Sequence, residues 1–180
     1  AVASFNAIDA TGIGSMKVRI GDTYALKITA DDNLLPLIKS EVKDGVLILS
    51  SASAIHSKTD VVYEVTAKAI NRLENSGTVS IDAQGFKGGS LKVETSGVGG
   101  TTLSGKVDSL KVELSGVGSI DAEALAADRV DVEMSGVGSG SVRADKSIRA
   151  NVSGVGSLTW KGAATDVSTS VSGVGRVAKG

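Results

Sequence analysis

The residues of this chain that could act together in chemistry are regularly spaced glutamates. Each stands two residues before a Ser-Gly step, and basic residues recur two positions earlier in the same segments. Stacked carboxylates could bind Ca²⁺ or act as an acid–base pair on a polysaccharide. Rows of opposite charge would instead neutralise one another and form a solvated face, which is the usual outcome of such patterning. The glutamates are Glu74, Glu94, Glu113 and Glu133, and the basic residues are Arg72, Lys92, Lys111 and Arg149.

We predict the charge-balanced face, and within it we name five candidate ligand-binding residues. They are Glu94, Glu113, Glu133, Lys92 and Lys111.

A row of serines offers hydroxyls for nucleophilic catalysis. A catalytic serine needs a nearby base, and the only histidine of the chain is His56, in the N-terminal third. Serine readily hydrogen-bonds local backbone, so we expect hydroxyls that bond between coils or to the turns, and a solvated His56. No catalytic residue is predicted. The serines are Ser96, Ser115, Ser135, Ser153 and Ser172.

The composition excludes several classes of function. The 180 residues contain no cysteine, which removes disulfides, thiol nucleophiles and cysteine-ligated metals. The 19 basic and 20 acidic residues show no clustered basic patch of the kind that binds nucleic acid. No apolar run approaches the ~20 residues of a membrane helix. We predict no metal and no cofactor, and membrane contact only through an anchor outside this chain.

The elements that position these side chains follow from an internal repeat. The tetrapeptide Ser-Gly-Val-Gly occurs five times, at steps of 19, 20, 18 and 19 residues, and a degenerate copy begins at Ser76. Before each Ser-Gly, apolar and polar residues alternate with period two, which indicates a strand with one buried face. A second apolar pair follows each Gly-Val-Gly, so each repeat holds two short strands. Trp160 occupies one such position and is expected to fill the core rather than stack on a sugar.

The glycines between the two strands are predicted to be structural corners. Glycine permits a positive φ or a close backbone approach there. A phosphate-binding loop would need a following helix, and none is indicated. Aspartates recur in the looser second corner, at Asp108, Asp128, Asp145 and Asp166, where we expect them to hydrogen-bond their own backbone. The corner glycines are Gly97, Gly99, Gly116, Gly118, Gly136, Gly138, Gly154, Gly156, Gly173 and Gly175.

Two strands and two corners in about 19 residues make one coil, and one coil cannot bury its own apolar face. The chain is therefore predicted to be all-β: a right-handed parallel β-helix, or solenoid, of short ~19-residue coils with an irregular β N-terminal cap. Residues 67–180 form the solenoid repeats. Residues 1–66 form an N-terminal β region that caps or continues the solenoid within one structural unit. Its expected strands are 4–10, 16–20, 24–30, 38–42, 46–50 and 61–66, with a hairpin turn at 43–45.

Motifs along nearly the whole chain resemble those of the putative auto-transporter adhesin, head GIN domain family, a bacterial family of unknown function. They are FNAI at 5–8, GIG at 12–14, VRIGD at 18–22, DDNLL at 31–35, EVKDGVLI at 41–48 and the Ser-Gly-Val-Gly repeats. The resemblance implies an exported or lipid-anchored protein at the periplasm or the cell surface, and it carries over no catalytic residue. Relatives often have Gly-Ser-Gly-Asp where this chain has Gly-Val-Gly-Ser, so a carboxylate column that could have bound a metal is missing.

Two functions remain open. The first is a non-catalytic, adhesin-like binding or structural module that contacts a glycan, matrix or protein surface, or forms a homo-oligomer. The second is a carbohydrate-active enzyme of the β-helical type, which would need a carboxylate pair inside a groove. Short loops in every repeat favour the first.

Overall fold

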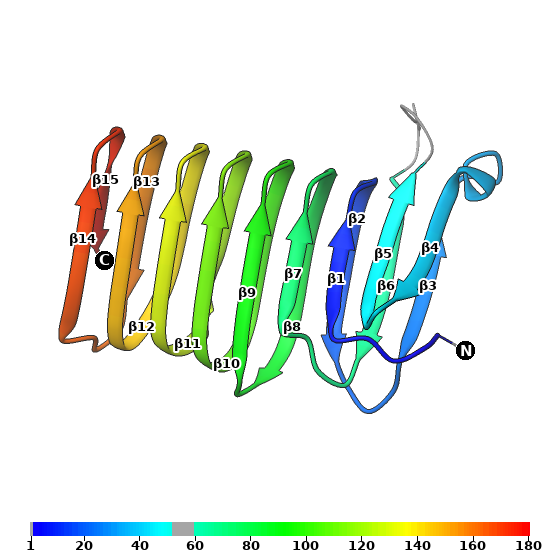
Figure 1. Ribbon diagram of the computed structural model, residues 1–180, viewed down its shortest axis with the longest axis horizontal. Helices are drawn as coiled ribbons and strands as arrows, with labels where there is room; N and C mark the ends of the chain where they lie inside the picture. The colour runs from blue at the N-terminus through cyan, green and yellow to red at the C-terminus, as the bar shows by residue number, and fades with distance from the viewer. Residues whose placement is uncertain (1, 52–59) are drawn as a thin grey trace.

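The computed structural model describes residues 2–51 and 60–180, and their strands stack into an elongated parallel β-solenoid (Figure 1). Each coil runs up one wall, turns, and runs down the opposite wall. The front wall consists of β4, β5, β1, β7 and β9, then residues 109–114, 129–134 and 147–152, then β14. The back wall carries β3, β6, β2 and β8, then the other halves of β10, β11 and β12, then β13 and β15. The predicted fold class is confirmed.

Three strands of the repeat region, β10, β11 and β12, have 16 to 18 residues because they continue through the second corner. The strands of this region are β7 (Arg72–Asn75), β8 (Thr78–Lys87), β9 (Ser90–Thr95), β10 (Val98–Leu114), β11 (Val117–Met134), β12 (Val137–Val152), β13 (Val155–Lys161), β14 (Asp166–Val171) and β15 (Val174–Lys179).

Successive coils pair in parallel and in register with the sequence repeat. Val98 pairs with Val117, which pairs with Val137, and the series continues through Val155 to Val174. Equivalent side chains therefore form straight columns, with neighbouring strands ~4.8 Å apart.

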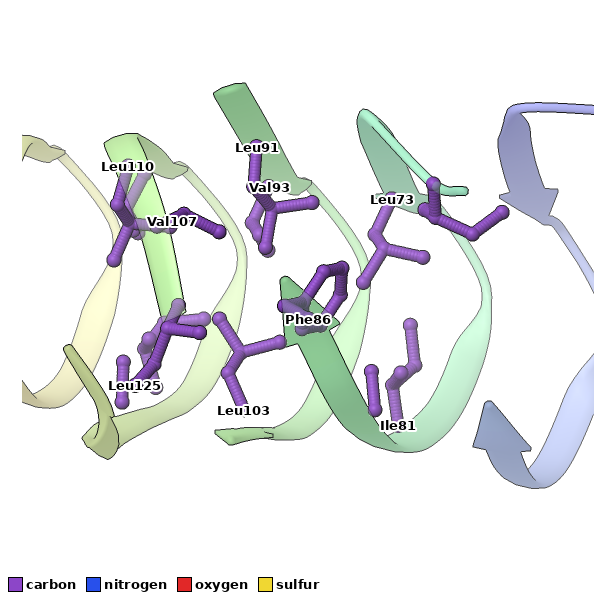
Figure 2. Packing of buried hydrophobic residues seen from close by; sticks show 14 of the residues in the cluster. Leu73, Ile81, Phe86, Leu91, Val93, Leu103, Val107, Leu110 and Leu125 are labelled. Atoms are coloured by element: carbon purple, nitrogen blue, oxygen red, sulfur yellow. The ribbon is translucent and has the colours of Figure 1, made fainter. Parts of the chain in front are cut away.

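The space between the walls is filled by apolar columns (Figure 2). Leu91, Leu110, Val130 and Ile148 form one column and are each at most 3% exposed. Burying one such side chain contributes about 1.5–3 kcal/mol. Trp160 is also buried, as expected, and the Lys179 ammonium lies 4.7 Å from the centre of its ring.

The Ser-Gly steps form the tight corner, and close backbone approach explains their glycines. Val117 N–H donates to the Gly97 carbonyl oxygen of the preceding coil at 3.0 Å, and Val137 N–H bonds Gly116 in the same way. A Cβ on Gly116 would collide with that Gly97 oxygen, and the same collision recurs in later coils. The corner therefore requires a residue without a side chain.

The N-terminal region adds further coils to the solenoid and covers the open edges of its first parallel strands. Its elements are β1 (Ala7–Ala10), β2 (Ile13–Ile20), β3 (Ala25–Thr29), a 3₁₀ turn (Leu35–Leu37), β4 (Ile38–Lys43), β5 (Val46–Ser51) and β6 (Val62–Ala67). The coil made by β1 and β2 lies between the β5–β6 coil and the β7–β8 coil, so the chain passes over its own first coil.

The two outermost strands run antiparallel to their neighbours: β4 pairs with β5 on the front wall, and β3 pairs with β6 on the back wall. The hairpin turn between β4 and β5 has positive φ at Asp44 (51°) and Gly45 (77°), the geometry that a two-residue β-hairpin favours. These strands close the N-terminal end of the parallel stack.

Candidate functional site: the charged front wall

The outward face of the front wall carries two charged columns. Period-two alternation points Leu91, Val93 and Thr95 inward, so Lys92 and Glu94 point outward. In-register pairing then places Lys92 beside Lys111, and Glu94 between Glu74 and Glu113. We call the six residues Arg72, Glu74, Lys92, Glu94, Lys111 and Glu113 the charge ladder.

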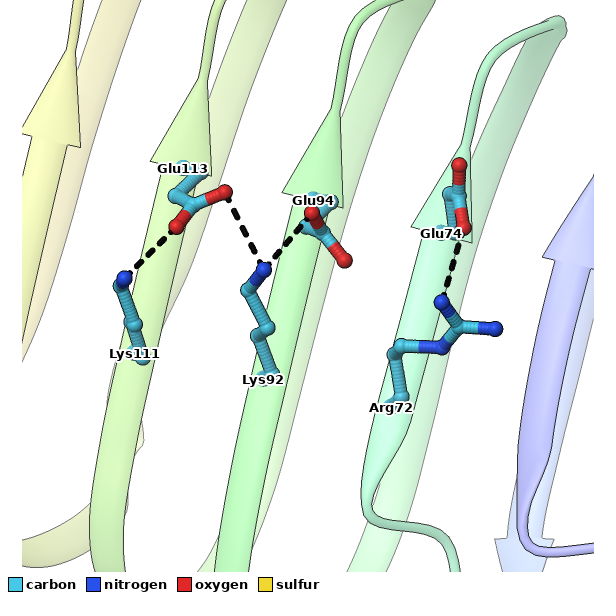
Figure 3. A network of polar contacts seen from close by, with 6 residues as sticks. All are labelled: Arg72, Glu74, Lys92, Glu94, Lys111 and Glu113. Carbon is cyan, nitrogen blue, oxygen red and sulfur yellow. Dashed lines mark hydrogen bonds and ion pairs between the residues drawn. The ribbon is translucent and has the colours of Figure 1, made fainter.

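Ion pairs run within and between the coils of the charge ladder (Figure 3). The Lys92 ammonium lies 2.8 Å from Glu94 Oε1 and 3.3 Å from Glu113 Oε2, so it joins two coils. Lys111 pairs with Glu113 at 2.8 Å, and Arg72 pairs with Glu74 at 3.5 Å. Hydrogen bonding by Lys111 lowers the pKa of Glu113, and hydrogen bonding to Glu94 raises the pKa of Lys92. Both groups therefore stay charged over a wider pH range than usual.

The alternation breaks in the next coils. Asp131 occupies the position of the lysines, next to Glu133, and Arg149 follows it in the same column. Arg129 stands one column earlier, between Ser109 and Ser147. Across the described residues, neither arginine has an acidic group within the 4.0 Å of an ion pair.

An open depression of about 530 Å³ lies over this break. We call it the arginine hollow, after its two unpaired arginines. It crosses four neighbouring strands of the front wall. Its lining residues are Ser109, Leu110, Lys111, Arg129, Val130, Asp131, Ser147, Ile148, Arg149, Asp166 and Ser168.

The structure brings four of the five candidate binding residues together, since Lys92, Glu94, Lys111 and Glu113 form one ion-pair network. Glu133 lies one coil further on, where a smaller depression also contains Asp131 and Arg149. Sequence reasoning did not select Arg129 and Asp131. The signal that could have found them is the loss of the Lys–Glu alternation at Asp131.

The predicted serine hydroxyl ladder does not form. Ser96, Ser115 and their equivalents are exposed, and in the described chain their hydroxyls make no hydrogen bond. Their backbone N–H groups instead donate to the coil before, as from Ser115 to the Thr95 carbonyl at 2.9 Å. A hydroxyl contact between coils occurs elsewhere, from Ser109 to Ser90 at 2.8 Å.

The valines of the repeat form a narrow exposed row beside these serines. Val98, Val117, Val137 and Val155 are each about half exposed, from 48% to 52%. The row is one side chain wide, with glycine on either side of each valine.

Two aspartates of the second corner, Asp108 and Asp128, act between coils rather than on their own backbone, whereas Asp145 pairs with Arg143 of its own coil at 3.3 Å. Asp108 accepts a hydrogen bond from the backbone N–H of Gly89, in the preceding coil, at 2.9 Å. Asp128 pairs with Lys146 of the following coil at 2.7 Å, and this hydrogen bond lowers its pKa. The expectation of local turn capping was wrong because stacking brings neighbouring corners within reach.

Metal binding finds no support in the described ranges, where no three histidine or acidic side chains gather as a possible metal site. His56 lies outside the described residues. In the part of the chain that the structure describes, no helix is long and apolar enough to cross a membrane.

Asp9 heads the column of outward acidic residues, and it is partly buried between Ile48 and Glu74. Its Oδ1 is buried without a hydrogen-bond partner. Burial raises the pKa of the Asp9 carboxyl, and the positive charge of Arg72 offsets part of this increase. A carboxyl whose folded-state pKa is raised stabilises the fold while protonated. That contribution is lost as the pH rises through the folded-state value, so the ionised group is destabilising at neutral pH.

Asp9→Asn is therefore expected to raise the melting temperature at pH 7 by roughly 2–4 °C, which corresponds to about 1 kcal/mol. The gain should vanish near pH 3, where the aspartate is protonated anyway. Thermal melts by circular dichroism at both pH values measure this, with the exposed Glu41→Gln as the control that gains nothing. A gain that persists unchanged at pH 3 would contradict the assignment to Asp9 ionisation.

The fold and its exposed columns define this molecule as a parallel β-solenoid with a charged lateral face. The chain matches the family described as putative auto-transporter adhesin, head GIN domain, over residues 4–164. It belongs to that family, which confirms the resemblance seen in the sequence.

One solved structure agrees with this assignment, and two others share the fold. A putative adhesin from Bacteroides fragilis is 29% identical with a TM-score of 0.81, covering 99% of this chain and 93% of its own. A putative adhesin from Parabacteroides distasonis is 23% identical, with a TM-score of 0.56 and coverage of 100% and 94%. A putative lipid binding protein from the same species is 21% identical, with a TM-score of 0.52 and the same coverage. The last two show likeness of fold alone. Comparison with curated proteins finds no match.

Proposed function

We propose that this protein is a non-catalytic bacterial module, exported to the periplasm or cell surface, that attaches to an extended glycan, matrix or protein surface through its front wall. The observation that carries the proposal is the in-register row of charged side chains across successive coils. Such a surface offers repetition along a line, and an extended partner can contact several coils at once. The family and the Bacteroides fragilis structure, each described as a putative adhesin, support the same function.

The enzyme alternative has weaker support from the carboxylates of the arginine hollow. Glycosidases hold two carboxyl groups ~5–9.5 Å apart on either side of the scissile bond. Asp131 and Asp166 lie on the same wall, two coils and two residues apart, and do not face each other across a cleft. The hollow is also open, whereas cleavage needs a site that positions the substrate closely.

The absence of cysteine from the sequence allows a direct test. A single cysteine introduced as Glu133→Cys on the front wall, or Thr102→Cys on the back wall, can be coupled to a bulky polymer. Both positions are exposed. Retention of each conjugate on immobilised polysaccharides and matrix proteins is then measured, and the soluble fraction is assayed for shortened glycan.

Polymer at position 133 is expected to abolish retention, polymer at position 102 to preserve it, and no glycan to be shortened. Loss of retention from the back-wall conjugate alone would overturn the proposed face. Appearance of shortened glycan would favour an enzyme.

A further inference from the structure

The arginine hollow differs from the charge ladder because its two arginines are available, although Lys111 lines the hollow and belongs to the ladder. Arg72, Lys92 and Lys111 each contact a glutamate of the ladder. Arg129 and Arg149 have no such partner among the described residues. A guanidinium presents a planar fork of donors that matches a carboxylate or a sulfate with two parallel hydrogen bonds.

Asp131 supplies a second sign of an unmet contact. Its Oδ1 is buried and has no hydrogen-bond partner, although Lys111 and Arg149 flank it in the column. A buried acceptor without a donor costs free energy, and such atoms call for an explanation in a folded protein. The other oxygen of this carboxylate, Oδ2, is not buried and also lacks a hydrogen-bond partner among the described residues, so it is the oxygen to which a hydroxyl of a bound molecule can donate.

The remaining polar groups of the hollow suit a molecule rich in hydroxyls. Ser147 and Ser168 each offer a hydroxyl that can donate and accept, and the Ser109 hydroxyl, which already donates to Ser90, can still accept. The cations are Lys111, Arg129 and Arg149, against the carboxylates of Asp131 and Asp166. The two carboxylates would repel a ligand with dense negative charge, so the pattern fits isolated anionic groups separated by hydroxyls.

The shape of the hollow fits a chain rather than a single small molecule. It crosses four strands spaced ~4.8 Å apart, which gives a length of about 14 Å. It is open, and its volume lies within the ~300–1,000 Å³ of ligand sites. No aromatic side chain lines it, so stacking against a neutral sugar ring cannot provide the affinity.

We propose that the arginine hollow binds an acidic polysaccharide. Arg129 and Arg149 hold its carboxylate or sulfate groups, while Asp131 accepts a hydrogen bond from a sugar hydroxyl. This inference rests on the proposed function, and it names the ligand class and the part of the front wall that selects it.

The test is titration calorimetry of the whole chain with four probes. They are a uronic-acid oligosaccharide, a sulfated oligosaccharide, a neutral oligosaccharide of equal length, and anionic phospholipid vesicles. One or both acidic oligosaccharides should bind, and the comparison between them identifies the anionic group. The neutral one should not bind detectably.

Arg149→Gln is expected to weaken binding about tenfold or more, since it removes one charge-assisted contact. Asp131→Asn should weaken it as well, because an amide oxygen is a poorer acceptor than a carboxylate. Arg19→Gln is the matched control, since Arg19 is exposed, belongs to β2 on the back wall and has no ion pair in the described ranges. Arg19 and Arg149 are exposed and Asp131 is partly exposed, and a thermal melt checks that each variant is folded.

Three results would overturn the inference: equal binding of the neutral oligosaccharide, unchanged affinity in Arg149→Gln, or binding of vesicles but of no saccharide. Tighter binding in Asp131→Asn would remove that residue's proposed role. These failures are distinct from failure of the proposed function. A protein surface whose retention is blocked by polymer at position 133, without saccharide binding, would defeat the hollow and leave the front wall supported.

Discussion

Gly116→Ala is expected to destabilise the protein by about 3 kcal/mol or more, the largest effect of any single methyl group we consider. The new Cβ would collide with the Gly97 carbonyl oxygen and lie 2.7 Å from the Ser96 carbonyl carbon. The Gly97 oxygen already accepts the hydrogen bond from Val117 N–H at 3.0 Å, so it cannot move away without breaking this backbone hydrogen bond between coils. The coils on either side depend on this contact because each coil packs only on its neighbours.

Urea unfolding followed by circular dichroism measures this effect. Gly100→Ala is the matched control, since Gly100 lacks a positive φ and its added Cβ meets the rotatable Ser119 hydroxyl at 3.2 Å. Ser115→Ala, at an exposed corner serine, should change stability by less than about 0.5 kcal/mol. Equal unfolding midpoints for Gly116→Ala and Gly100→Ala would show that close approach is not what requires glycine at the corner.

Val130→Ala is expected to cost about 2–3 kcal/mol, whereas Val167→Ala should cost less than about 1 kcal/mol. The two valines occupy the same column and differ in their surroundings. Val130 is 3% exposed between two coils, but Val167 is 44% exposed because β14 has a neighbouring strand on one side only. Removing the same two methyl groups therefore leaves a cavity at position 130 and little change at position 167.

Equilibrium unfolding of the two variants under identical conditions provides the measurement. Because the substitution is the same, differences in side-chain volume and strand propensity largely cancel. Similar losses at the two positions would mean that stability does not come from packing between coils.

The two predictions together explain how a chain with so few aromatic residues folds. The corner glycines let neighbouring coils approach to hydrogen-bonding distance, and the stacked aliphatic side chains then exclude water from the space between the walls. The ion pairs of the charge ladder add little, since exposed pairs contribute about 0–1 kcal/mol each. Their mutual neutralisation does restrict the ladder as a binding surface, which leaves the unpaired arginines as the groups free to recruit a partner.

The coil, its register and its buried columns follow from the residue pattern alone. A fixed period with alternating burial favours one register of strand pairing, because a shift by one residue would turn Leu91 and Leu110 toward solvent and Lys92 into the core. The N-terminal strands were also predictable, since the segments around Val18, Leu47 and Val65 alternate in the same way. The position of the hairpin followed from Asp44 and Gly45, which suit the positive φ of its turn.

The order of the coils and the charges that remain unpaired depend instead on contacts between segments that are distant in the chain. Nothing local in β1 and β2 indicates that their coil lies between β5–β6 and β7–β8, since parallel strands with similar patterns can pair in several orders. The freedom of Arg129 and Arg149 is likewise a matter of distance to groups on adjacent coils. The alternation along a strand determines which way a side chain points, but the pairing of that strand with its neighbours determines which residues the side chain contacts.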